Sequence, residues 1–523
     1  MRPLLTAFLA IGVTSAHAAT IQVGAGDSYA KIEAAQAGDE VVIAPGRYAF
    51  RVHLTRQASA SAPIVIRAQD PSNPPVWDLG ASLVENAPGS YTAGDRGRGC
   101  WQISGGTNYH ISGIVFTNCR NAGANSAGLR YYNGARGILV RDCTFRTNDN
   151  GITGGTQDSE ITVEFSEFDR NGNLQASTSA PTHNIYVYGG TFTLRFSYVH
   201  DPVQGQNFHI RSRSGVIEYS WIARGRSYEG DLMTDDDIPG AGSPPYAQTL
   251  LLRGNLILQD AAPQNRGQII AVYNDAGRAG LTLGIRLVNN TIVGNGGHAS
   301  LVHLSNADGT AMTAELSNNL VYGTTVPALV ETASAATVTG TSNWLPTGAS
   351  PGPLASSVQS ASPGFRDTAA KDFTLAAASA AIGAASPSVS GLPDAEYYRD
   401  EAQGRMYRLR ASTRDIGAFE STTGGAGIGP YGAAPPPSGG SGPAAPASPE
   451  RGSGCGTTGG PAGGLLPVLF LLALLEARRT VAMPSSVPPA VPAAVAAPRP
   501  DPAHGALAGE REWAPTGPSP WSS

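Results

Sequence analysis

A short phrase recurs through the middle of the chain, and its spacing restricts the fold more than any other feature. Copies include VRDCTFRTN at 140–148, LRFSYVHD at 194–201 and LVNNTIVGN at 287–295. Aligning one small or polar residue of each copy gives the column Ile114, Cys143, Ser166, Ser197, Ser220, Asn255, Asn290 and Asn318, at intervals of 29, 23, 31, 23, 35, 35 and 28 residues. Near-regular intervals of this length are typical of repeat architectures.

Each repeat holds two or three short segments of alternating apolar and polar residues, without helical periodicity. The 65 glycines indicate many tight turns between short strands. Stacked units of this kind form a β-solenoid with rungs about 4.8 Å apart. The column then lies inside the coil, where Asn amides can hydrogen-bond from rung to rung. The sequence therefore predicts an all-β solenoid in which this column is structural.

Strand alternation also predicts which side chains face outward. In HNIYVYG at 183–189, inward Ile185 and Val187 leave Tyr186 and Tyr188 outside, together with Asn184. The same reasoning predicts an outward set on further rungs: His209, Arg211, Arg213, Glu229, Asp231, Tyr273 and His303, with Asn121, Arg130 and Tyr132 on earlier rungs. These segments occupy one place in their repeats, so we expect one outer face. Aromatic rings, cations and carboxylates along a face suit a long sugar polymer.

This face is compatible with β-elimination on a uronic-acid polymer. That reaction needs a cation that neutralises the sugar carboxylate and a base near the C5 proton. The candidate cations are Arg211 and Arg213, and the candidate bases are His209, Tyr186 and His200. Tyr188, Arg213, Tyr273 and His303 are predicted to bind the polymer.

Two other chemistries use the carboxylates of the same face. Glu229 and Asp231 lie two residues apart in sequence, or about 6–7 Å between Cα atoms in a strand, and could act as a glycosidase pair. Together with Asp235–Asp237 they could instead supply oxygen ligands to calcium in a metal-assisted elimination. Predicted catalytic residues are therefore His209, Arg211, Tyr186, Glu229 and Asp231.

Structural roles remain open for several of these residues. Arg211 could form a cross-rung ion pair with Glu229 or Asp231. His183 and His200 lie at strand ends, where a turn-capping hydrogen bond competes with a catalytic role. The acidic run Asp235–Asp237 matches no calcium motif and could be a solvated loop, within the segment 233–248 that we expect to overhang the same face.

The composition excludes one class of partner. Charged residues make up 14% of the chain and the net charge is −5, without basic blocks. Nucleic-acid binding usually needs a basic stripe, so we expect none. An anionic sugar polymer remains compatible, because a local cluster of arginines is enough to bind it.

The N-terminal segment indicates that the protein is exported. Residues 1–18 combine Arg2, an apolar run and Ala16-His17-Ala18, which predicts a signal peptide. Export permits a disulfide, and three of the four cysteines, Cys100, Cys119 and Cys143, lie in the globular part, so at least one of these thiols stays free. The absence of a C-x-x-C pair argues against a cysteine-based zinc or redox site.

The opening VGAGDSYAKIEAAQAGDEVVIAPGRYAF at 23–50, with a helix expected over Tyr29–Ala37 and a strand over Glu40–Ile43, resembles the N-terminal entry of right-handed parallel β-helix proteins, the superfamily of pectate lyases and alginate-type lyases. HNIYV at 183–187, SYEGDL at 227–232 and VNNTIV at 288–293 resemble one exported branch of it. The resemblance covers about residues 20–420 and implies a right-handed parallel β-helix with a capping helix. The superfamily includes lyases, hydrolases, epimerases and non-catalytic adhesins, so it leaves the activity open.

The C-terminal region differs in composition. Residues 422–464 form a Gly/Pro/Ala/Ser-rich linker, and 481–523 form a Pro/Ala-rich tail that we expect to be disordered. Between them, GCGTTGGPAGGLLPVLFLLALLEARRT at 454–480 resembles a myxobacterial surface-sorting signal, in which Cys455 would be the processing and attachment point. Its apolar run is short for a bilayer span, and the chain continues past the basic pair of 478–479.

These features predict an exported, monomeric, single-domain β-helix over 19–421, followed by a surface anchor at 465–480. The predicted function is cleavage of an acidic polysaccharide by β-elimination. A non-catalytic carbohydrate-binding or adhesive surface protein is the alternative, and a hydrolase or epimerase is a variant of the enzyme hypothesis.

Overall fold

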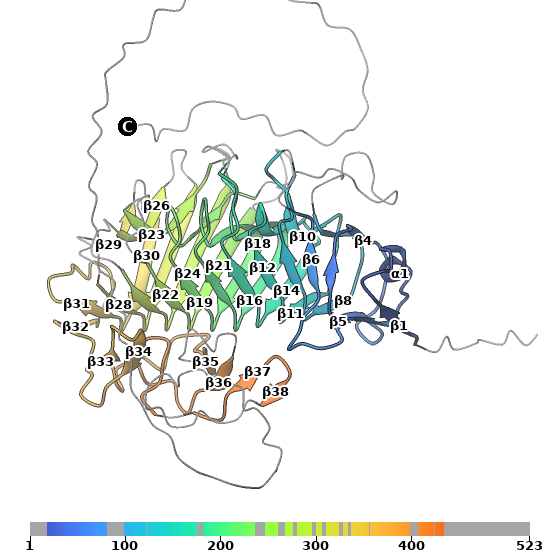
Figure 1. Ribbon diagram of the computed structural model, residues 1–523. Coiled ribbons are helices and arrows are strands. Elements are labelled where there is room, and N and C mark those ends of the chain that lie inside the picture. The colour runs from blue at the N-terminus through green and yellow to red at the C-terminus, as the bar shows by residue number, and fades with distance from the viewer. Residues whose placement is uncertain are drawn as a thin grey trace, which may run out of the picture. The chain divides into compact units, whose positions relative to one another are not determined.

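The computed structural model describes residues 18–433, except 81–98, 122, 175–180, 236–245, 260–266, 276–279, 295–299, 306–309, 324–327, 333–335, 355, 398–405 and 423. The described chain winds into a coil of parallel strands (Figure 1). Each complete turn adds one strand to each of three faces, which the chain visits in the order face 1, face 2, face 3. The predicted right-handed parallel β-helix is confirmed, whereas the predicted signal peptide falls almost wholly outside the described residues.

Faces 1 and 2 together form one 20-stranded sheet, because β16 and β18 run across both. Face 1 consists of β4 (Val52–Leu54), β7 (Trp101–Ser104), β10 (Ala127–Tyr132), β13 (Asn150–Gly154), the first halves of β16 (Ile185–Arg195) and β18 (Phe208–Glu218), β20 (Gly230–Met233), β23 (Gln268–Tyr273), β26 (Ser300–Ser305) and β29 (Ala328–Thr332). Face 2 consists of β1 (Thr20–Val23), β2 (Glu40–Ile43), β5 (Ile64–Ala68), β8 (Tyr109–Ser112), β11 (Ile138–Arg141), β14 (Glu160–Glu164), the second halves of β16 and β18, β21 (Tyr246–Arg253), β24 (Leu281–Val288), β27 (Ala311–Ser317) and β30 (Ala336–Thr341).

Face 3 is a separate sheet of 12 strands. It consists of β3 (Arg47–Tyr48), β6 (Val76–Asp78), β9 (Val115–Thr117), β12 (Thr144–Arg146), β15 (Glu167–Asp169), β17 (Tyr198–His200), β19 (Trp221–Ala223), β22 (Leu256–Leu258), β25 (Thr291–Val293), β28 (Leu320–Tyr322), β31 (Trp344–Pro346) and β32 (Val358–Ser360).

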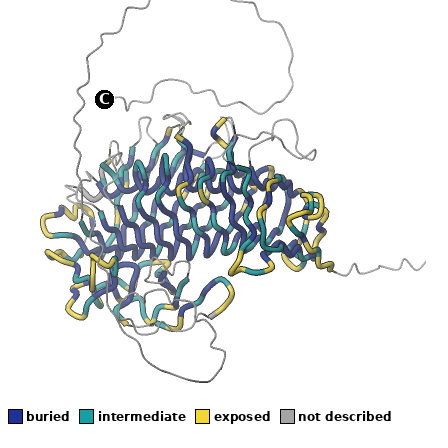
Figure 2. The backbone as a smooth tube through the Cα atoms, in the orientation of Figure 1, coloured by how far each residue is buried: buried dark blue, intermediate teal, exposed yellow. Residues whose placement is uncertain are grey.

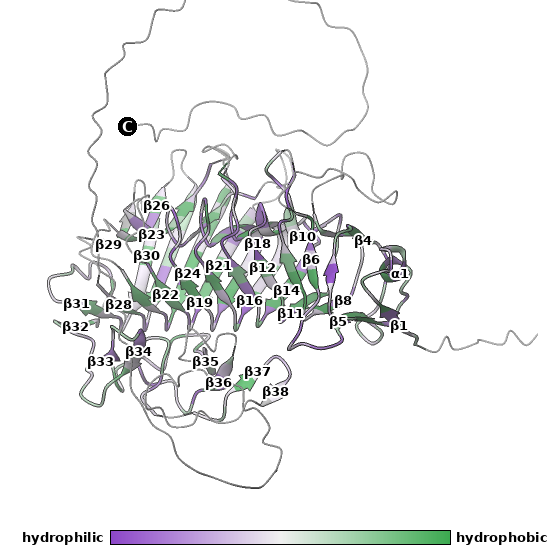
Figure 3. Cartoon of the chain, viewed as in Figure 1, coloured by the Kyte–Doolittle hydropathy of each residue, from purple (hydrophilic) through white to green (hydrophobic). Residues whose placement is uncertain are grey.

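The core fills the inside of the coil. Apolar residues in register stack from rung to rung: Ile185 lies beside Phe208, and Val187 beside Ile210, and all four are buried. Burying a side chain of this size contributes about 1.5–3 kcal/mol. Figure 2 shows buried residues along the stack and exposed ones mainly at its ends, and Figure 3 shows apolar and polar residues mixed along the strands. The alternation of side chains between the two sides of each strand thus accounts for the apolar residues that face the core.

The predicted polar column lies buried at the turn from face 2 to face 3. The backbone N–H of Ser220 donates to Oδ1 of Asn255 at 3.0 Å, and the N–H of Asn255 donates to Oδ1 of Asn290 at 3.0 Å. The next member is Asn319 and not Asn318, so the predicted last position is wrong. Asn318 has a φ of 58° and occupies the left-handed turn position before the column, which Asn tolerates better than most residues.

A short helix closes the N-terminal end. Helix α1 covers only Ala30–Glu33, four of the nine residues expected, and its Ile32 is buried against the core. The strand predicted over Glu40–Ile43 is present with these bounds as β2. Cys100 and Cys119 form a disulfide, and Cys143 is a buried thiol in the polar column.

After the last rung, residues 362–433 return along the coil, and we call them the C-terminal strap. The strap contains β33 (Phe365–Asp367), β34 (Asp372–Leu375), β35 (Ala395–Tyr397), β36 (Tyr407–Leu409), β37 (Ile428–Gly429) and β38 (Gly432–Ala433). Its contacts pass from late to early rungs, pairing Ser386 with Asn318, Ser390 with Arg286, Asp394 with Tyr219 and Tyr407 with Phe196. Ordered chain therefore continues past residue 422, where the linker was predicted to begin.

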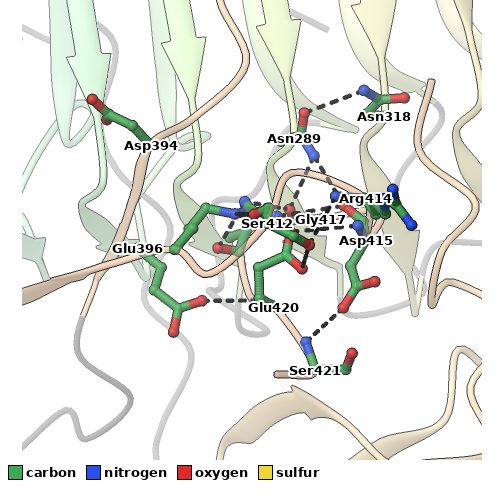
Figure 4. Close-up of polar contacts among 12 residues, drawn as sticks. Asn289, Asn318, Asp394, Glu396, Ser412, Arg414, Asp415, Gly417, Glu420 and Ser421 are labelled. Atoms are coloured by element: carbon green, nitrogen blue, oxygen red, sulfur yellow. Dashed lines mark hydrogen bonds and ion pairs between the residues drawn. The ribbon is translucent and has the colours of Figure 1, made fainter. Parts of the chain in front are cut away.

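Buried polar contacts hold the strap against the coil. Asn289 donates through Nδ2 to the carbonyl oxygen of Asp415 at 3.0 Å (Figure 4). Within the strap, Arg410 and Glu420 form an ion pair in which both side chains are buried. Apolar side chains of face 3, including Trp221 and Leu256, pack on Tyr397 and Phe419 of the strap. No helix among the described residues is long and apolar enough to cross a membrane.

Candidate functional site

The outward residues of face 1 form two rows along the coil. In the first row, strand register aligns Arg130, Thr153, Tyr186, His209, Asp231, Ala271 and His303 on successive rungs. In the second row Tyr188 pairs with Arg211, and Met233 pairs with Tyr273. The polar side chains cluster where Tyr186, His209 and Asp231 follow one another, and this cluster is the candidate site.

His209 is the centre of the site and is 7% exposed. Its Nδ1 lies 2.8 Å from Oδ1 of Asp231. Its Nε2 accepts a hydrogen bond from Nε of Arg211 at 2.9 Å. Because an acceptor nitrogen carries no proton, this bond places the proton of the neutral imidazole on Nδ1, the ring nitrogen nearer to Asp231.

Aromatic rings fix the plane of this imidazole. His183 stacks on His209 with ring centroids 4.5 Å apart and an interplanar angle of 7°. Tyr186 meets the His209 ring edge-on at 4.7 Å, and Tyr188 meets Tyr186 at 5.9 Å. Tyr186 and Tyr188 are half-buried, so each retains a surface that a ligand can reach.

Asp231 is fully buried beside His209 on the next rung. The hydroxyl of Tyr228 donates to its Oδ2 at 3.0 Å, and Nε2 of Gln206 donates to the same oxygen at 3.1 Å. Burial raises the pKa of Asp231 to about 7. The carboxyl group therefore titrates near neutral pH, which is unusual for a structural aspartate.

Arg211 lies beside His209 and is 8% exposed. Its Nη1 donates to the carbonyl oxygen of Thr234 at 2.7 Å, and its Nη2 forms an ion pair with Asp275 in the turn after β23. Among the described residues no ion pair joins Arg211 to Glu229 or Asp231, so the expected cross-rung pair is wrong. Asp275 itself is exposed.

Glu229 does not face the site, contrary to the prediction. Its side chain is 0% exposed and accepts hydrogen bonds from Nδ2 of Asn207 at 2.7 Å and from the N–H of Gly225 at 2.8 Å. It thereby ends a second buried column, which includes Asn171, Asn184 and Asn207 at the turn from face 3 to face 1. Burial raises the pKa of Glu229 to about 8.

The cause of this error also explains Asn184, which was predicted to face outward and is buried. Asn184, Asn207 and Glu229 each immediately precede a strand, so strand alternation does not apply to them. Consequently Glu229 and Asp231 lie on opposite sides of the backbone, and the carboxylate pair required by the hydrolysis hypothesis does not face one site.

The proposed calcium ligands do not fit a metal centre. Asp235 is buried and accepts hydrogen bonds from the N–H of Gly189 at 3.0 Å, from Nε2 of Gln157 at 3.0 Å and from the hydroxyl of Tyr246 at 2.5 Å. Its assignment to a solvated loop is therefore wrong as well. Calcium takes six to eight oxygen ligands at one point. Glu229, Asp231 and Asp235 instead bind separate protein donors, while Asp236 and Asp237 lie outside the described residues.

The remaining predicted residues are divided among three places. Tyr273 and His303 lie further along face 1, with ring centroids 5.7 Å apart. Arg213 lies in a separate hollow at the bend between faces 1 and 2. His200 lies on face 3, where its Nδ1 is 2.7 Å from Asp201, so it cannot act as the base of the candidate site. Cys455 lies outside the described residues.

Sequence reasoning missed several contributors to the site, namely His183, Gln206, Tyr228 and Asp275. His183 was treated as a turn residue; its Nδ1 does accept the N–H of Gln206 at 3.2 Å, yet its ring also supports His209. Burial lowers the pKa of His183 well below its usual value, so this support is uncharged. All four lie outside the alternating part of a strand, where only the three-dimensional structure reveals direction.

No protein-family model and no curated protein matches the chain. Similar solved structures include an alginate lyase from Paenibacillus sp. str. FPU-7, at 14% sequence identity and a TM-score of 0.42 over 61% of this chain and 97% of that chain. The pectate lyase Pel9A is 15% identical, with a TM-score of 0.45 over 77% of this chain and 96% of that chain. A Yersinia enterocolitica Family 28 exopolygalacturonase is 13% identical, with a TM-score of 0.28 over 62% of this chain and 79% of that chain.

Proposed function

We propose that the protein is an exported, surface-associated polysaccharide lyase that cleaves an acidic polysaccharide by β-elimination. One observation carries this proposal: on the outer side of face 1, a single imidazole accepts a hydrogen bond from a guanidinium at one nitrogen and lies 2.8 Å from a buried carboxylate at the other. A base with a fixed tautomer and an adjacent cation are the two groups that this elimination requires.

Arg211 is the residue that would bind the uronate carboxylate. A substrate carboxylate would replace or join Asp275 at Nη2 of Arg211. Neutralising that carboxylate makes the proton on C5 of the sugar more acidic and stabilises the negative charge that develops during its removal. The contact of Nη1 with the Thr234 carbonyl keeps the guanidinium in position.

His209 is the residue that would remove the C5 proton. Substrate binding shifts the Arg211 donor from Nε2 of His209 to the sugar, and the freed lone pair takes the proton. Asp231 stabilises the imidazolium that results, since it lies 2.8 Å from Nδ1. The C5–H electron pair becomes the C4–C5 double bond as the bond from C4 to the glycosidic oxygen breaks.

Tyr186 is the residue that would protonate the leaving oxygen. It lies against the His209 ring on the preceding rung and is half-buried. Its hydroxyl proton passes to the glycosidic oxygen, and the proton held by His209 then restores the tyrosine through solvent. Tyr188, Tyr273 and His303 offer further ring surfaces for sugars along face 1.

The proposal is tested with the full chain and a panel of uronate polymers, including polygalacturonate and alginate. We expect an increase in ultraviolet absorbance from the unsaturated product with at least one polymer. His209→Ala should abolish it. His200→Ala is the matched control, because His200 is a similarly buried, ion-paired histidine on face 3. Cleavage without unsaturated product would indicate a hydrolase, and tight binding without cleavage would indicate an adhesin.

A further inference from the structure

A hollow of about 360 Å³ lies at the bend between faces 1 and 2, apart from the candidate site. Four consecutive rungs line it: Arg136 lies in the turn before β11, Gln157 and Asp158 in the turn before β14, Gly190 on β16, and Arg213 on β18. Its volume is at the lower end of the range usual for small-molecule sites. Three rung spacings of about 4.8 Å separate the two arginines, so they lie at the two ends of the hollow.

The charged side chains of this hollow differ from the others on face 2. Elsewhere on that face, arginines pair with glutamates on neighbouring rungs, as Arg195 does with Glu164 at 2.8 Å and Arg286 with Glu315 at 2.7 Å. Within the described part of the chain, Arg136 and Arg213 form no ion pair. The same is true of Asp158 and Glu160 in the hollow.

These unpaired charges define a chemical preference. Two exposed guanidinium groups at the ends can each donate two parallel hydrogen bonds to a carboxylate or sulfate. Asp158 and Glu160 lie on the rung next to that of Arg136, where their carboxylates can accept hydrogen bonds from hydroxyl groups. A strip of hydroxyl-bearing rings with anionic substituents satisfies both kinds of group at once.

The hollow is also connected to the candidate site. Gln157 donates to Asp235, which in turn accepts the N–H of Gly189, the residue after Tyr188. Arg213 follows Arg211 by two residues on β18. A polymer that leaves the candidate site across the edge of face 1 would therefore enter the hollow.

We propose that this hollow is a second sugar-binding site, which holds an anionic residue of the same polymer away from the bond that is cleaved. The anionic character of the ligand rests on the proposed function, whereas the site itself rests on the unpaired charges around the hollow. Arg136 and Arg213 bind the anionic groups, and Asp158 and Glu160 bind ring hydroxyls.

The test measures binding of oligogalacturonate and oligoalginate to the full chain carrying His209→Ala, which prevents turnover. Adding Arg213→Ala or Arg136→Ala should weaken binding of the better ligand about tenfold, the value expected for a lost charged hydrogen bond. Arg146→Ala is the matched control, because Arg146 is exposed on face 3 and forms no ion pair with another described residue. It should leave the affinity unchanged.

Equal affinities for the Arg213, Arg136 and Arg146 variants would overturn the second site, as would the absence of binding by either oligosaccharide. Failure of the proposed lyase function would give a different experimental result. In that case the unmutated chain releases no unsaturated product, while the Arg213 and Arg136 variants still lose affinity. If product forms and these two substitutions leave KM unchanged, the second site is wrong and the lyase proposal stands.

Discussion

Nδ1 of His209 on β18 lies 2.8 Å from Oδ1 of Asp231 on the neighbouring strand β20. The strand register places these two residues directly side by side, so the pair is set by the backbone of the coil and not by a loop. Because two adjacent strands orient this base, thermal motion changes the distance and orientation of the pair only slightly.

Replacing Asp231 tests whether this pair supports catalysis. Asp231→Asn keeps the volume but removes the negative charge that stabilises the His209 imidazolium. We expect kcat to fall on the order of a hundredfold or more, with a smaller effect on KM. A thermal unfolding curve close to that of the unmutated protein would assign the loss to chemistry. Unchanged kcat would exclude His209 and Asp231 as a catalytic unit.

The pH dependence of activity should follow the ionisation of the same pair. Burial raises the pKa of Asp231 to about 7, and only the ionised carboxylate can stabilise a charged His209. Activity should therefore rise as pH increases through about 7. Initial rates of product release at fixed ionic strength from pH 5 to about pH 9 would measure this. A rate that falls over this range would contradict the assignment of His209 as base.

Arg211 should not be replaceable by lysine. The guanidinium reaches His209, Thr234 and Asp275 at the same time, and an ammonium group cannot reproduce that planar arrangement. We expect Arg211→Lys to lower kcat/KM by roughly tenfold to a hundredfold, corresponding to one or two lost charged hydrogen bonds. Steady-state kinetics on the polymer that gives product would measure kcat/KM of this variant. A value near that of the unmutated protein would show that the positive charge alone suffices.

Stability should decrease as pH rises from about 4.5 to about 8 because of Glu229. Burial raises its folded-state pKa to about 8, above the ordinary value of 4.5, so the protonated form favours the folded state. Its contribution is complete below the ordinary pKa and is lost as pH rises through about 8, at a slope of about 1.4 kcal/mol per pH unit. Glu229→Gln should flatten the dependence of Tm on pH. An unchanged slope in this variant would place the titration elsewhere.

The polar column should tolerate serine better than alanine at position 290. Asn290 accepts from the N–H of Asn255 and donates to the carbonyl oxygen of Leu252. Asn290→Ala leaves both buried groups unsatisfied, and we expect a loss of about 2–5 kcal/mol in urea unfolding. Asn290→Ser retains an acceptor, as Ser220 does in the same column, so its loss should be smaller. Equal losses would show that packing and not hydrogen bonding dominates the column.

The parts of the fold and site that the sequence predicted are those governed by strand alternation. Ile185, Val187 and Ile210 face inward, and His209 and Arg211 belong to the outer side of the same strand, because a period of two is a property of every strand. The repeat spacing predicted the coil for a similar reason, since each turn must return to the same face.

The rest depends on geometry that alternation does not describe. Glu229 turns inward because it precedes its strand, and the partner of Arg211 is Asp275 because the turn after β23 reaches across two rungs. His183 supports His209 through ring stacking from outside any strand. The side-chain contacts of residues that lie in turns depend on the conformation of those turns, which a single sequence does not reveal.

The C-terminal strap has a consequence for how the coil unfolds. A plain solenoid has only neighbour-to-neighbour contacts, so its terminal rungs can open one at a time. Here Asp394 and Tyr407 bind Tyr219 and Phe196, residues 175 and 211 positions earlier in the chain. The last rungs therefore cannot open independently while the strap is in place. These contacts raise the contact order, so folding should be slow. Unfolding should be a single cooperative transition of the rungs that the strap contacts.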